Sequence, residues 1–235
     1  MSPISRSSSQ PDVGVLLAAA GSGERVGGEP KQFREIAGVP MLLRALRPFA
    51  QHPRVRQLVI ALPAAFVDAP PEWLETVVSG RLRLVAGGAT RAESVLAALR
   101  ALDERCSTVL IHDAARPFVS YETIETVIET ASATGAVPCV PVTDTLKRAE
   151  EGSGRVVETV ARDGLWRAQT PQGFPRDMLE AAYKRFGEDG ISQLTDEAAL
   201  FEAAGYTVRV VPDSGRNIKI TTPSDFMIAE VLAQR

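Results

Sequence analysis

Short apolar runs alternate with amphipathic stretches along most of the chain. The runs have the length of single strands and cover residues 13–17, 57–62, 81–85, 108–111, 135–142 and 207–211. Apolar positions at helical spacing recur between and after them, over residues 41–51, 72–78, 92–102, 121–134, 175–186, 196–204 and 223–232. Strands that alternate with helices through short connections form a parallel sheet with helices on both faces. The pattern therefore predicts an α/β fold of the Rossmann-like, doubly wound kind, with a mostly parallel sheet.

The alternation breaks between residues 143 and 167. Residues 145–149 and 156–160 have strand character and flank a polar, Gly-rich turn, which predicts a β-hairpin. The hairpin has little apolar surface with which to pack on the sheet, and an isolated hairpin is marginally stable. We therefore predict a projecting β-arm, residues 143–167, that packs on a second copy of the chain in a homodimer. A free, mobile hairpin is the alternative.

Length and composition are those of an ordinary globular protein. The 235 residues suffice for one domain over residues 13–235, and the Ser- and Pro-rich residues 1–12 predict a disordered tail. With 26 basic against 29 acidic residues and a net charge of −3, no charge excess favours nucleic acid or a membrane as a partner. The two cysteines lie outside any metal-binding motif, and no apolar run has membrane-spanning length. We expect a cytoplasmic protein.

The candidate chemistry gathers in the loops that follow the strands. Open α/β sheets bind ligands at the carboxyl ends of their strands, so four loops are expected to meet at one rim: residues 18–31, 87–94, 112–117 and 217–221. These loops carry Ser94, Asp113 and five cations, namely Arg25, Lys31, Arg91, Arg116 and Lys219. Positive charge gathered in a cleft of a net acidic protein attracts anionic substrates.

The first of these loops predicts a binding site for a nucleoside triphosphate. A buried strand leads into Ala19, Ala20, Gly21 and Gly23, and a glycine-rich turn can bring backbone N–H groups against phosphates. A dinucleotide-binding fold is disfavoured because the third glycine of its fingerprint is out of place, and no P-loop string occurs. We expect Arg91 to contact the same nucleotide from the second loop.

A series of longer motifs extends this interpretation over nearly the whole chain. In order they are AAAGSGER with PKQF, GGATRAESV, IHDAARPFV, PVTDTLKR, LWRAQTPQGF, LTDEAAL and NIKIT. With these motifs the chain resembles the 2-C-methyl-D-erythritol 4-phosphate cytidylyltransferase family of the non-mevalonate isoprenoid pathway. The resemblance implies a nucleotidyltransferase fold and a reaction that joins a sugar-alcohol phosphate to CMP from CTP, releasing pyrophosphate.

The resemblance also implies roles at the nucleotide. Arg25, Lys31 and Lys219 match the catalytic cations, which hold the triphosphate and the charge that develops at the α-phosphate. Gly88 and Ser94 match positions that contact the cytosine. The nucleotide side of the site is thus expected to be built from the first, second and last of the four loops.

Other matching residues are implied to bind the acceptor. Asp113 matches an aspartate beside the ribose and the acceptor, and Arg116 its neighbouring arginine. Thr170 and Thr195 match hydroxyls that line the acceptor pocket. Two residues of the arm match side chains that reach the acceptor in the partner subunit: Thr145 and Arg162. Two alternatives stay open at this point, a cytidylyltransferase for another polyol phosphate such as ribitol 5-phosphate, and a nucleotide-binding module without catalysis.

Charge considerations complete the expected mechanism. A phosphomonoester has a second pKa of about 6, so the acceptor phosphate can attack without a general base. We therefore expect His112 to be structural and His52 to lie on a surface turn, while Trp73 and Trp166 are expected to be packing residues. Mg²⁺ is expected to bridge the triphosphate, held mostly by phosphate oxygens, with Asp113 as the candidate protein ligand.

Overall fold

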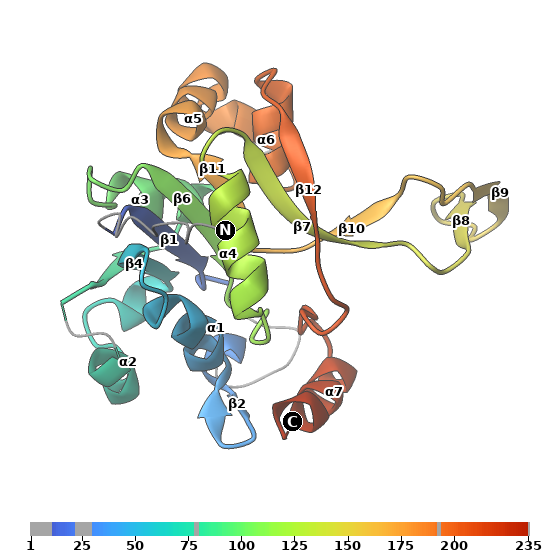
Figure 1. The fold of residues 1–235 in the computed structure, drawn as a ribbon. Helices are drawn as coiled ribbons and strands as arrows, with labels where there is room; N and C mark the ends of the chain where they lie inside the picture. The colour runs from blue at the N-terminus through green and yellow to red at the C-terminus, as the bar shows by residue number, and fades with distance from the viewer. Residues whose placement is uncertain (1–10, 22–29, 78–79, 192–193, 235) are drawn as a thin grey trace, which may run out of the picture.

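An eight-stranded sheet forms the centre of the fold (Figure 1). The computed structural model describes residues 11–21, 30–77, 80–191 and 194–234. The path β10–β7–β11–β6–β1–β4–β5, with β12 beside β7, connects the strands. They are β1 Val13–Ala18, β4 Val55–Leu62, β5 Leu82–Ala86, β6 Thr108–Asp113, β7 Gly135–Pro141, β10 Trp166–Ala168, β11 Gln172–Pro175 and β12 Val208–Pro212.

The sheet is mostly parallel, as predicted. The strands β5, β4, β1 and β6 run parallel to one another, and β12 runs parallel to β7. Two short antiparallel strands were not anticipated: β11 pairs with both β6 and β7, and β10 pairs with β7. The strand β11 lies between β6 and β7 and runs antiparallel to β6. The segment that enters β11 therefore lies at the same rim of the sheet as the carboxyl ends of β1 and β6.

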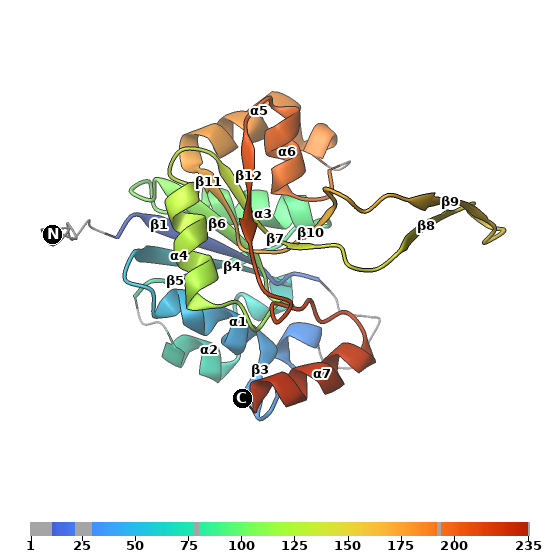
Figure 2. The same ribbon diagram turned by 45° about the vertical axis from the view of Figure 1, so that its right-hand side comes forward.

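Helices cover both faces of the sheet (Figure 2). They are α1 Met41–Ala50, α2 Glu72–Val77, α3 Arg91–Arg100, α4 Tyr121–Thr130, α5 Arg176–Ile191, α6 Glu197–Ala203 and α7 Pro223–Ala233. The short elements are the 3-10 helices η2 Lys31–Phe33 and η3 Ala64–Phe66, and the hairpin of β2 Glu35–Ile36 with β3 Val39–Pro40. The helix predicted over residues 121–134 ends earlier, at Thr130, and α1 continues through Pro48.

The continuous apolar run in β1 follows from burial on both sides. Val15 and Leu17 belong to the core that includes Phe49 of α1, on the face that α4 also covers. Leu16, between them, belongs to the opposite core with Leu99 of α3. All of these side chains have at most 2% of their surface exposed. Successive side chains of a strand point to opposite faces, so a central strand of this fold needs apolar residues at every position.

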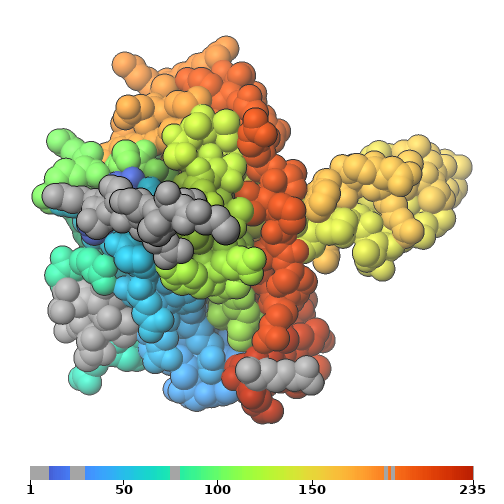
Figure 3. Space-filling view, in the orientation of Figure 1, coloured from blue at the N-terminus to red at the C-terminus, as the bar shows by residue number. Residues whose placement is uncertain are grey.

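The predicted hairpin is present and projects from the body of the protein (Figure 3). It consists of β8 Leu146–Ala149 and β9 Val156–Val160, which pair antiparallel. The strand β10 continues from its base back into the main sheet. Val156 and Val157 are 56% and 58% exposed, so the arm buries little of its own apolar surface.

Two expectations about individual side chains were wrong. His52 does not lie on the surface: it is fully buried, its Nε2 lies 2.8 Å from Glu125 Oε2, and its ring stacks on Tyr121. Trp166 is 43% exposed at the base of the arm. Trp73, in contrast, packs edge-on against an aromatic ring of η2. These differences arise because contacts from distant elements, not the local sequence, decide what is covered.

The start of the chain and membrane contact were also part of the prediction. Of the tail expected over residues 1–12, residues 1–10 lie outside the described residues. Asp12 already belongs to the fold, because its carboxylate pairs with Arg54 at 3.0 Å and its N–H donates to the Arg54 carbonyl. In the part of the chain that the structure describes, no helix combines the length and the apolar character needed to cross a membrane.

Candidate active site

The four predicted loops converge on one cleft of about 750 Å³ at the carboxyl ends of β1, β5 and β6. Among the residues described, the lining includes three cations and a single acid. The lining residues are Ala18, Ala19, Ala20, Gly21, Lys31, Gln32, Met41, Gly88, Ala89, Thr90, Arg91, Ser94, Asp113, Ala114, Ala115, Lys219 and Thr221. Gly23 and Arg25, predicted for the same loop, lie outside the described residues.

The first loop is joined to the last predicted loop through a lysine. Lys31, in η2, donates a hydrogen bond of 2.7 Å from Nζ to the carbonyl of Ile220. Gln32, next to it, is buried and donates from Nε2 to the carbonyl of Ala19 at 2.8 Å. The end of β1 and residues 217–221 are therefore held together although they are distant in sequence, and Lys31 lies between them.

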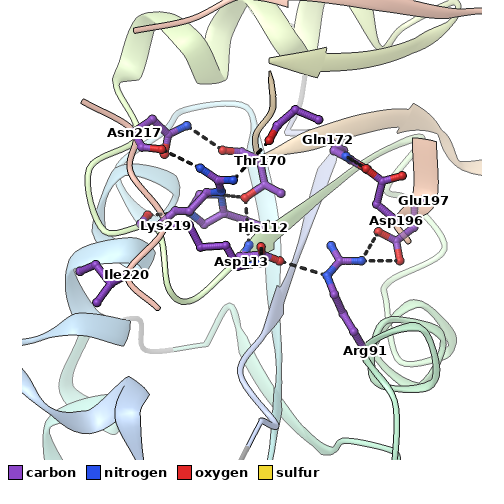
Figure 4. Close-up of polar contacts among 12 residues, drawn as sticks. Arg91, His112, Asp113, Thr170, Gln172, Asp196, Glu197, Asn217, Lys219 and Ile220 are labelled. Carbon is purple, nitrogen blue, oxygen red and sulfur yellow. Dashed lines mark hydrogen bonds and ion pairs between the residues drawn. The ribbon is translucent and has the colours of Figure 1, made fainter. Parts of the chain in front are cut away.

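Asp113 is the electrostatic centre of the cleft (Figure 4). Its Oδ1 accepts from Arg91 Nε at 3.1 Å, and its Oδ2 lies 2.7 Å from Lys219 Nζ. Burial alone would raise the pKa of this carboxyl group, but the charges of Arg91 and Lys219 outweigh burial and hold the pKa below its usual value. Asp113 is thus ionised at neutral pH, and each of its oxygens already faces a cation.

Arg91 is shared between two acidic groups. Its Nη1 donates to Glu197 Oε1 and Oε2 at 3.0 and 2.7 Å, while its Nε donates to Asp113. Burial disfavours the charge of Arg91, but Glu197 and Asp113 more than compensate, so its pKa lies above the usual value. The Tyr183 hydroxyl donates to Glu197 Oε1 at 3.2 Å, and burial followed by the charge of Glu197 raises the pKa of Tyr183.

Another part of the cleft wall is formed where Gly87 and Gly88, after β5, lie close against the end of β1 and the start of α3. A Cβ placed on Gly87 would lie 2.1 Å from Ala20 Cβ and 2.8 Å from Ser94 Oγ. The Gly88 N–H donates to Ser94 Oγ at 3.1 Å, and the Ser94 hydroxyl donates to the Thr90 carbonyl at 2.9 Å. Thr90 also caps α3 by accepting from a backbone N–H of its first turn. A side chain at position 87 would therefore force this wall to move.

The histidine at the rim is structural, as expected. His112 Nε2 donates to the Arg116 carbonyl at 2.9 Å, which fixes the proton on Nε2. His112 Nδ1 then accepts from the Thr170 hydroxyl at 2.9 Å, and the same hydroxyl accepts from the Asp113 N–H at 3.1 Å. Burial lowers the pKa of His112 to about 4, so the ring is neutral at pH 7. Thr170 therefore helps to position Asp113.

Five predicted acceptor residues lie outside this cleft within one chain, and the first of them is Thr170, which is buried against His112. Arg116 is buried below the rim, where Nη1 donates to the Asn217 carbonyl at 2.7 Å. Thr195 is exposed and lines a neighbouring cavity of about 80 Å³ beside Arg91 and Glu197. The other two are exposed near the ends of the arm strands: Thr145 and Arg162. The Arg162 guanidinium donates to the Thr143 carbonyl.

A protein-held metal centre is not formed by the residues described. Nowhere in the described ranges do three His, Cys, Asp or Glu side chains gather as metal ligands would. Asp113 is the one acid in the described lining, and both of its oxygens pair with cations. The arrangement fits a divalent ion that arrives on phosphate oxygens, with Asp113 as its one nearby carboxylate.

Sequence reasoning missed three polar residues that support the site. Gln32 holds the end of β1, and Glu197 holds Arg91. Asn217 is buried and donates from Nδ2 to the Thr170 carbonyl at 2.9 Å, which ties the last loop to the segment entering β11. The only signal for them in the sequence is their position inside the motifs PKQF, LTDEAAL and NIKIT.

The comparisons with known proteins agree over nearly the whole chain. A family model described as 2-C-methyl-D-erythritol 4-phosphate cytidylyltransferase (IspD) matches residues 13–235. A protein of that name from Salinibacter ruber is 44% identical over 220 residues, which are 93% of this chain and 91% of the relative. One from Frankia casuarinae is 42% identical over 228 residues, 96% of this chain and 82% of the relative.

A solved structure extends the agreement to three dimensions. The crystal structure of 2-C-methyl-D-erythritol 4-phosphate cytidylyltransferase from Thermus thermophilus matches with a TM-score of 0.80 at 35% identity, and covers 94% of this chain and 98% of the other. Neither a different polyol phosphate as acceptor nor a binding module without catalysis is favoured by these matches. The chain belongs to the 2-C-methyl-D-erythritol 4-phosphate cytidylyltransferase family and is a nucleotidyltransferase of isoprenoid synthesis.

Proposed function

We propose that the cleft transfers CMP from CTP to the phosphate of 2-C-methyl-D-erythritol 4-phosphate and releases pyrophosphate. The observation that carries this proposal is the cationic lining: Lys31, Arg91 and Lys219 share with one ionised carboxylate, Asp113, a cleft large enough for a nucleotide. Two anions must meet in this reaction, and clustered cations lower the electrostatic cost of bringing them together.

The two walls of the cleft suggest how CTP lies in it. The cytosine lies against the glycine-rich wall at Gly88, which the Ser94 hydroxyl holds in place by accepting from the Gly88 N–H and donating to the Thr90 carbonyl. The phosphates extend toward Lys31 and Lys219, which line the part of the cleft formed by η2 and residues 217–221. Arg25, from the same loop, is proposed to contact the triphosphate as well. This orientation places the α-phosphate beside the two lysines and the ribose beside Asp113.

The chemical step is an in-line displacement. An oxygen of the acceptor phosphate forms a bond to the α-phosphorus, and the bond from that phosphorus to the bridging oxygen of the β-phosphate breaks. The electron pair leaves with pyrophosphate, so no proton has to move before the attack. This agrees with His112, whose two ring nitrogens are both engaged in hydrogen bonds and which is neutral at pH 7. Positioning and cationic stabilisation supply the catalysis.

We propose Mg²⁺ as the cofactor, bound with the nucleotide. Phosphate oxygens would hold most of its coordination sphere, and Asp113 would supply a protein ligand as the one carboxylate in the described lining. When bound, the ion neutralises charge on the triphosphate and the leaving pyrophosphate. Lys31 and Lys219 perform the corresponding task for the α-phosphate from the protein side.

We propose that the arm completes the acceptor site of a partner subunit in a homodimer. Within one chain, Thr145 and Arg162 lie on the arm and do not line the cleft. The exposed Val156 and Val157 supply apolar surface that a second chain could cover. A cytoplasmic location is also proposed, supported by Cys106 and Cys139, which are both buried and free.

A pyrophosphate-release assay tests the proposed function. With CTP and Mg²⁺ present, we expect release with 2-C-methyl-D-erythritol 4-phosphate and at least about tenfold less with ribitol 5-phosphate, because acceptor hydroxyls that lack partners lose binding free energy. Replacing CTP by UTP or ATP should reduce release in the same assay. Tight CTP binding without release on any polyol phosphate would overturn catalysis and favour a binding module.

A further inference from the structure

A buried carboxylate lies just behind the cleft and takes no part in the step described above. The side chain of Glu197 is 2% exposed, at the start of α6. Its two oxygens accept from Arg91 Nη1 at 3.0 and 2.7 Å, and Oε1 also accepts from the Tyr183 hydroxyl. A buried charge without partners is strongly unfavourable, so Glu197 depends on this guanidinium.

The same guanidinium reaches the cleft on its other side. Arg91 Nε donates to Asp113 Oδ1 at 3.1 Å, and Asp113 Oδ2 lies 2.7 Å from Lys219 Nζ. A continuous chain of charges thus runs from Glu197 through Arg91 and Asp113 to Lys219 (Figure 4). Arg91, Asp113 and Lys219 all line the cleft, and Lys219, with 44% of its side chain exposed, is the most exposed of the three. Its place therefore depends on what holds Asp113 and Arg91.

The segment that carries Glu197, at one end of this series of charges, is hydrogen-bonded to the central sheet. Asp196 caps α6 by accepting from the Ala199 N–H at 2.9 Å, and its other oxygen accepts from Gln172 Nε2 at 2.7 Å. Gln172 Oε1 accepts in turn from the Ala198 N–H at 3.1 Å. Because Gln172 belongs to β11, the backbone around Glu197 cannot shift without breaking contacts to the central sheet.

We propose that Glu197 is a positioning residue that holds Arg91 on Asp113 and, through Asp113, fixes Lys219 for the α-phosphate. The proposal rests on the proposed function for the role of Lys219. Without Glu197, the Arg91 guanidinium would keep only one anionic partner, Asp113. The nucleotide phosphates would then attract Arg91 away from Asp113. Lys219 would then lose its fixed place, and a displacement of about 1 Å can cost 10²-fold in rate.

The first test compares two carboxylates of the same helix. Glu197→Gln should lower kcat by about tenfold to 100-fold, and change the KM for CTP by less than about threefold, since the interaction lost acts on positioning. Glu202→Gln, on the exposed side of α6, should leave both constants unchanged. Tyr183→Phe removes only one donor to Glu197 and should give a smaller loss of kcat. An equal loss in both glutamate variants would overturn the proposal.

A double-mutant cycle separates positioning from general destabilisation. If Glu197 acts through Arg91, Glu197→Gln should add less than about twofold to the loss already caused by Arg91→Gln. Losses that multiply would mean that Glu197 acts independently of Arg91 and would overturn the proposal. Thermal unfolding of each variant identifies any that fails to fold, and Tyr183→Phe then takes the place of Glu197→Gln in the same cycle.

A spectroscopic readout does not depend on turnover. The ¹⁵N–¹H signal of Arg91 Nε, assigned by its loss in Arg91→Lys, should exchange slowly in the wild type because that group donates to Asp113. Exchange should accelerate by about tenfold or more in Glu197→Gln and not in Glu202→Gln, because a local opening equilibrium governs it. Unchanged exchange in Glu197→Gln contradicts the positioning role. A wild type that releases no pyrophosphate, in contrast, contradicts the proposed function and leaves this measurement valid.

Discussion

The cleft and the arm are built in opposite ways. In the cleft, Asp113 is buried, each of its oxygens meets a cation, and its backbone N–H is bonded to Thr170. In the arm, the ion pair of Arg148 with Glu158 lies between two exposed side chains. Exposed pairs of this kind stabilise a protein by about 0–1 kcal/mol, whereas buried, hydrogen-bonded charges are held firmly in one geometry.

This difference indicates a division of work between the two regions. The cleft is preorganised by contacts within one chain, which suits nucleotide binding and stabilisation of the transition state. The arm leaves Val156 and Val157 uncovered, which is the surface that the proposed partner subunit would contact. Changes in the cleft should therefore affect the chemical step, and changes in the arm should affect assembly and the acceptor.

The largest effect is expected from Lys31→Ala. Pyrophosphate release should fall by at least roughly 10²–10³-fold, because a preorganised cation at the reacting phosphate is lost. Steady-state kinetics with saturating CTP checks this, and Lys184→Ala, an exposed lysine of α5, serves as the control. Near-normal turnover in Lys31→Ala would remove that residue from the catalytic assignment.

Deleting residues 150–155 tests the arm without touching the cleft. The proposed dimer should dissociate more readily, so that Arg162 no longer reaches the acceptor of the other chain. The KM for the acceptor should then rise by about tenfold or more, because each charged hydrogen bond lost costs about 1.5–3 kcal/mol. Analytical ultracentrifugation measures the first effect and kinetics the second. Circular dichroism should be nearly unchanged, since the backbone hydrogen bonds of this turn stay within the arm. An unchanged sedimentation profile counts against dimerisation through the arm.

A smaller effect is expected from Gly87→Ala in the nucleotide wall. The added Cβ would lie 2.1 Å from Ala20 Cβ, so the loop must move, at a cost of about 1–3 kcal/mol for overpacking. The KM for CTP should rise by about tenfold, while the KM for the acceptor stays near its original value. Gly215→Ala, where nothing lies within 4 Å of the new Cβ, is the matched control.

The last prediction concerns His112, whose effect is absent at neutral pH and develops only as the pH falls. Its folded-state pKa of about 4 lies below the ordinary value of 6.5, so the unfolded chain takes up the proton first as the pH falls. The contribution of neutral His112 to the free energy of unfolding is therefore fully present above pH 6.5. It should decrease by about 3 kcal/mol as the pH falls to 4. Asp113, whose pKa is lowered, loses its contribution only at still lower pH. Urea unfolding at pH 7 and pH 4.5 checks this, and equal free energies of unfolding would contradict it.

Much of the fold was predictable because the parallel strands are buried on both faces. Their apolar runs and the helices between them follow directly from that burial, as β1 illustrates. The strands β10 and β11 were not predictable in the same way. They contain polar residues such as Arg167 and Gln172, and their pairing depends on the neighbours that β6 and β7 provide. A short strand without an apolar pattern is specified by its partners.

The candidate site shows the same division. Lys31 and Asp113 could be predicted because loops at the carboxyl ends of parallel strands must meet, and Lys219 because its motif NIKIT resembles the family. Glu197 could not be predicted in this way. Its buried carboxylate is stabilised by Arg91, which lies more than a hundred residues earlier in the chain. His52 was misplaced for the same reason: Tyr121 and Glu125, which cover it, belong to a distant helix.

Whether an arm and a cleft from different chains form one active site is tested most directly by mixing two impaired variants. Lys31→Ala lacks a working cleft but keeps its arm, and the double variant Thr145→Ala with Arg162→Ala keeps its cleft. An equimolar mixture should regain pyrophosphate release at low acceptor concentration, to about a quarter of the wild-type rate. About half of the dimers formed by random pairing are mixed, and one of the two sites in each mixed dimer is complete. A mixture that stays inactive, although a tag on one variant retains the other, would contradict a site shared between two chains.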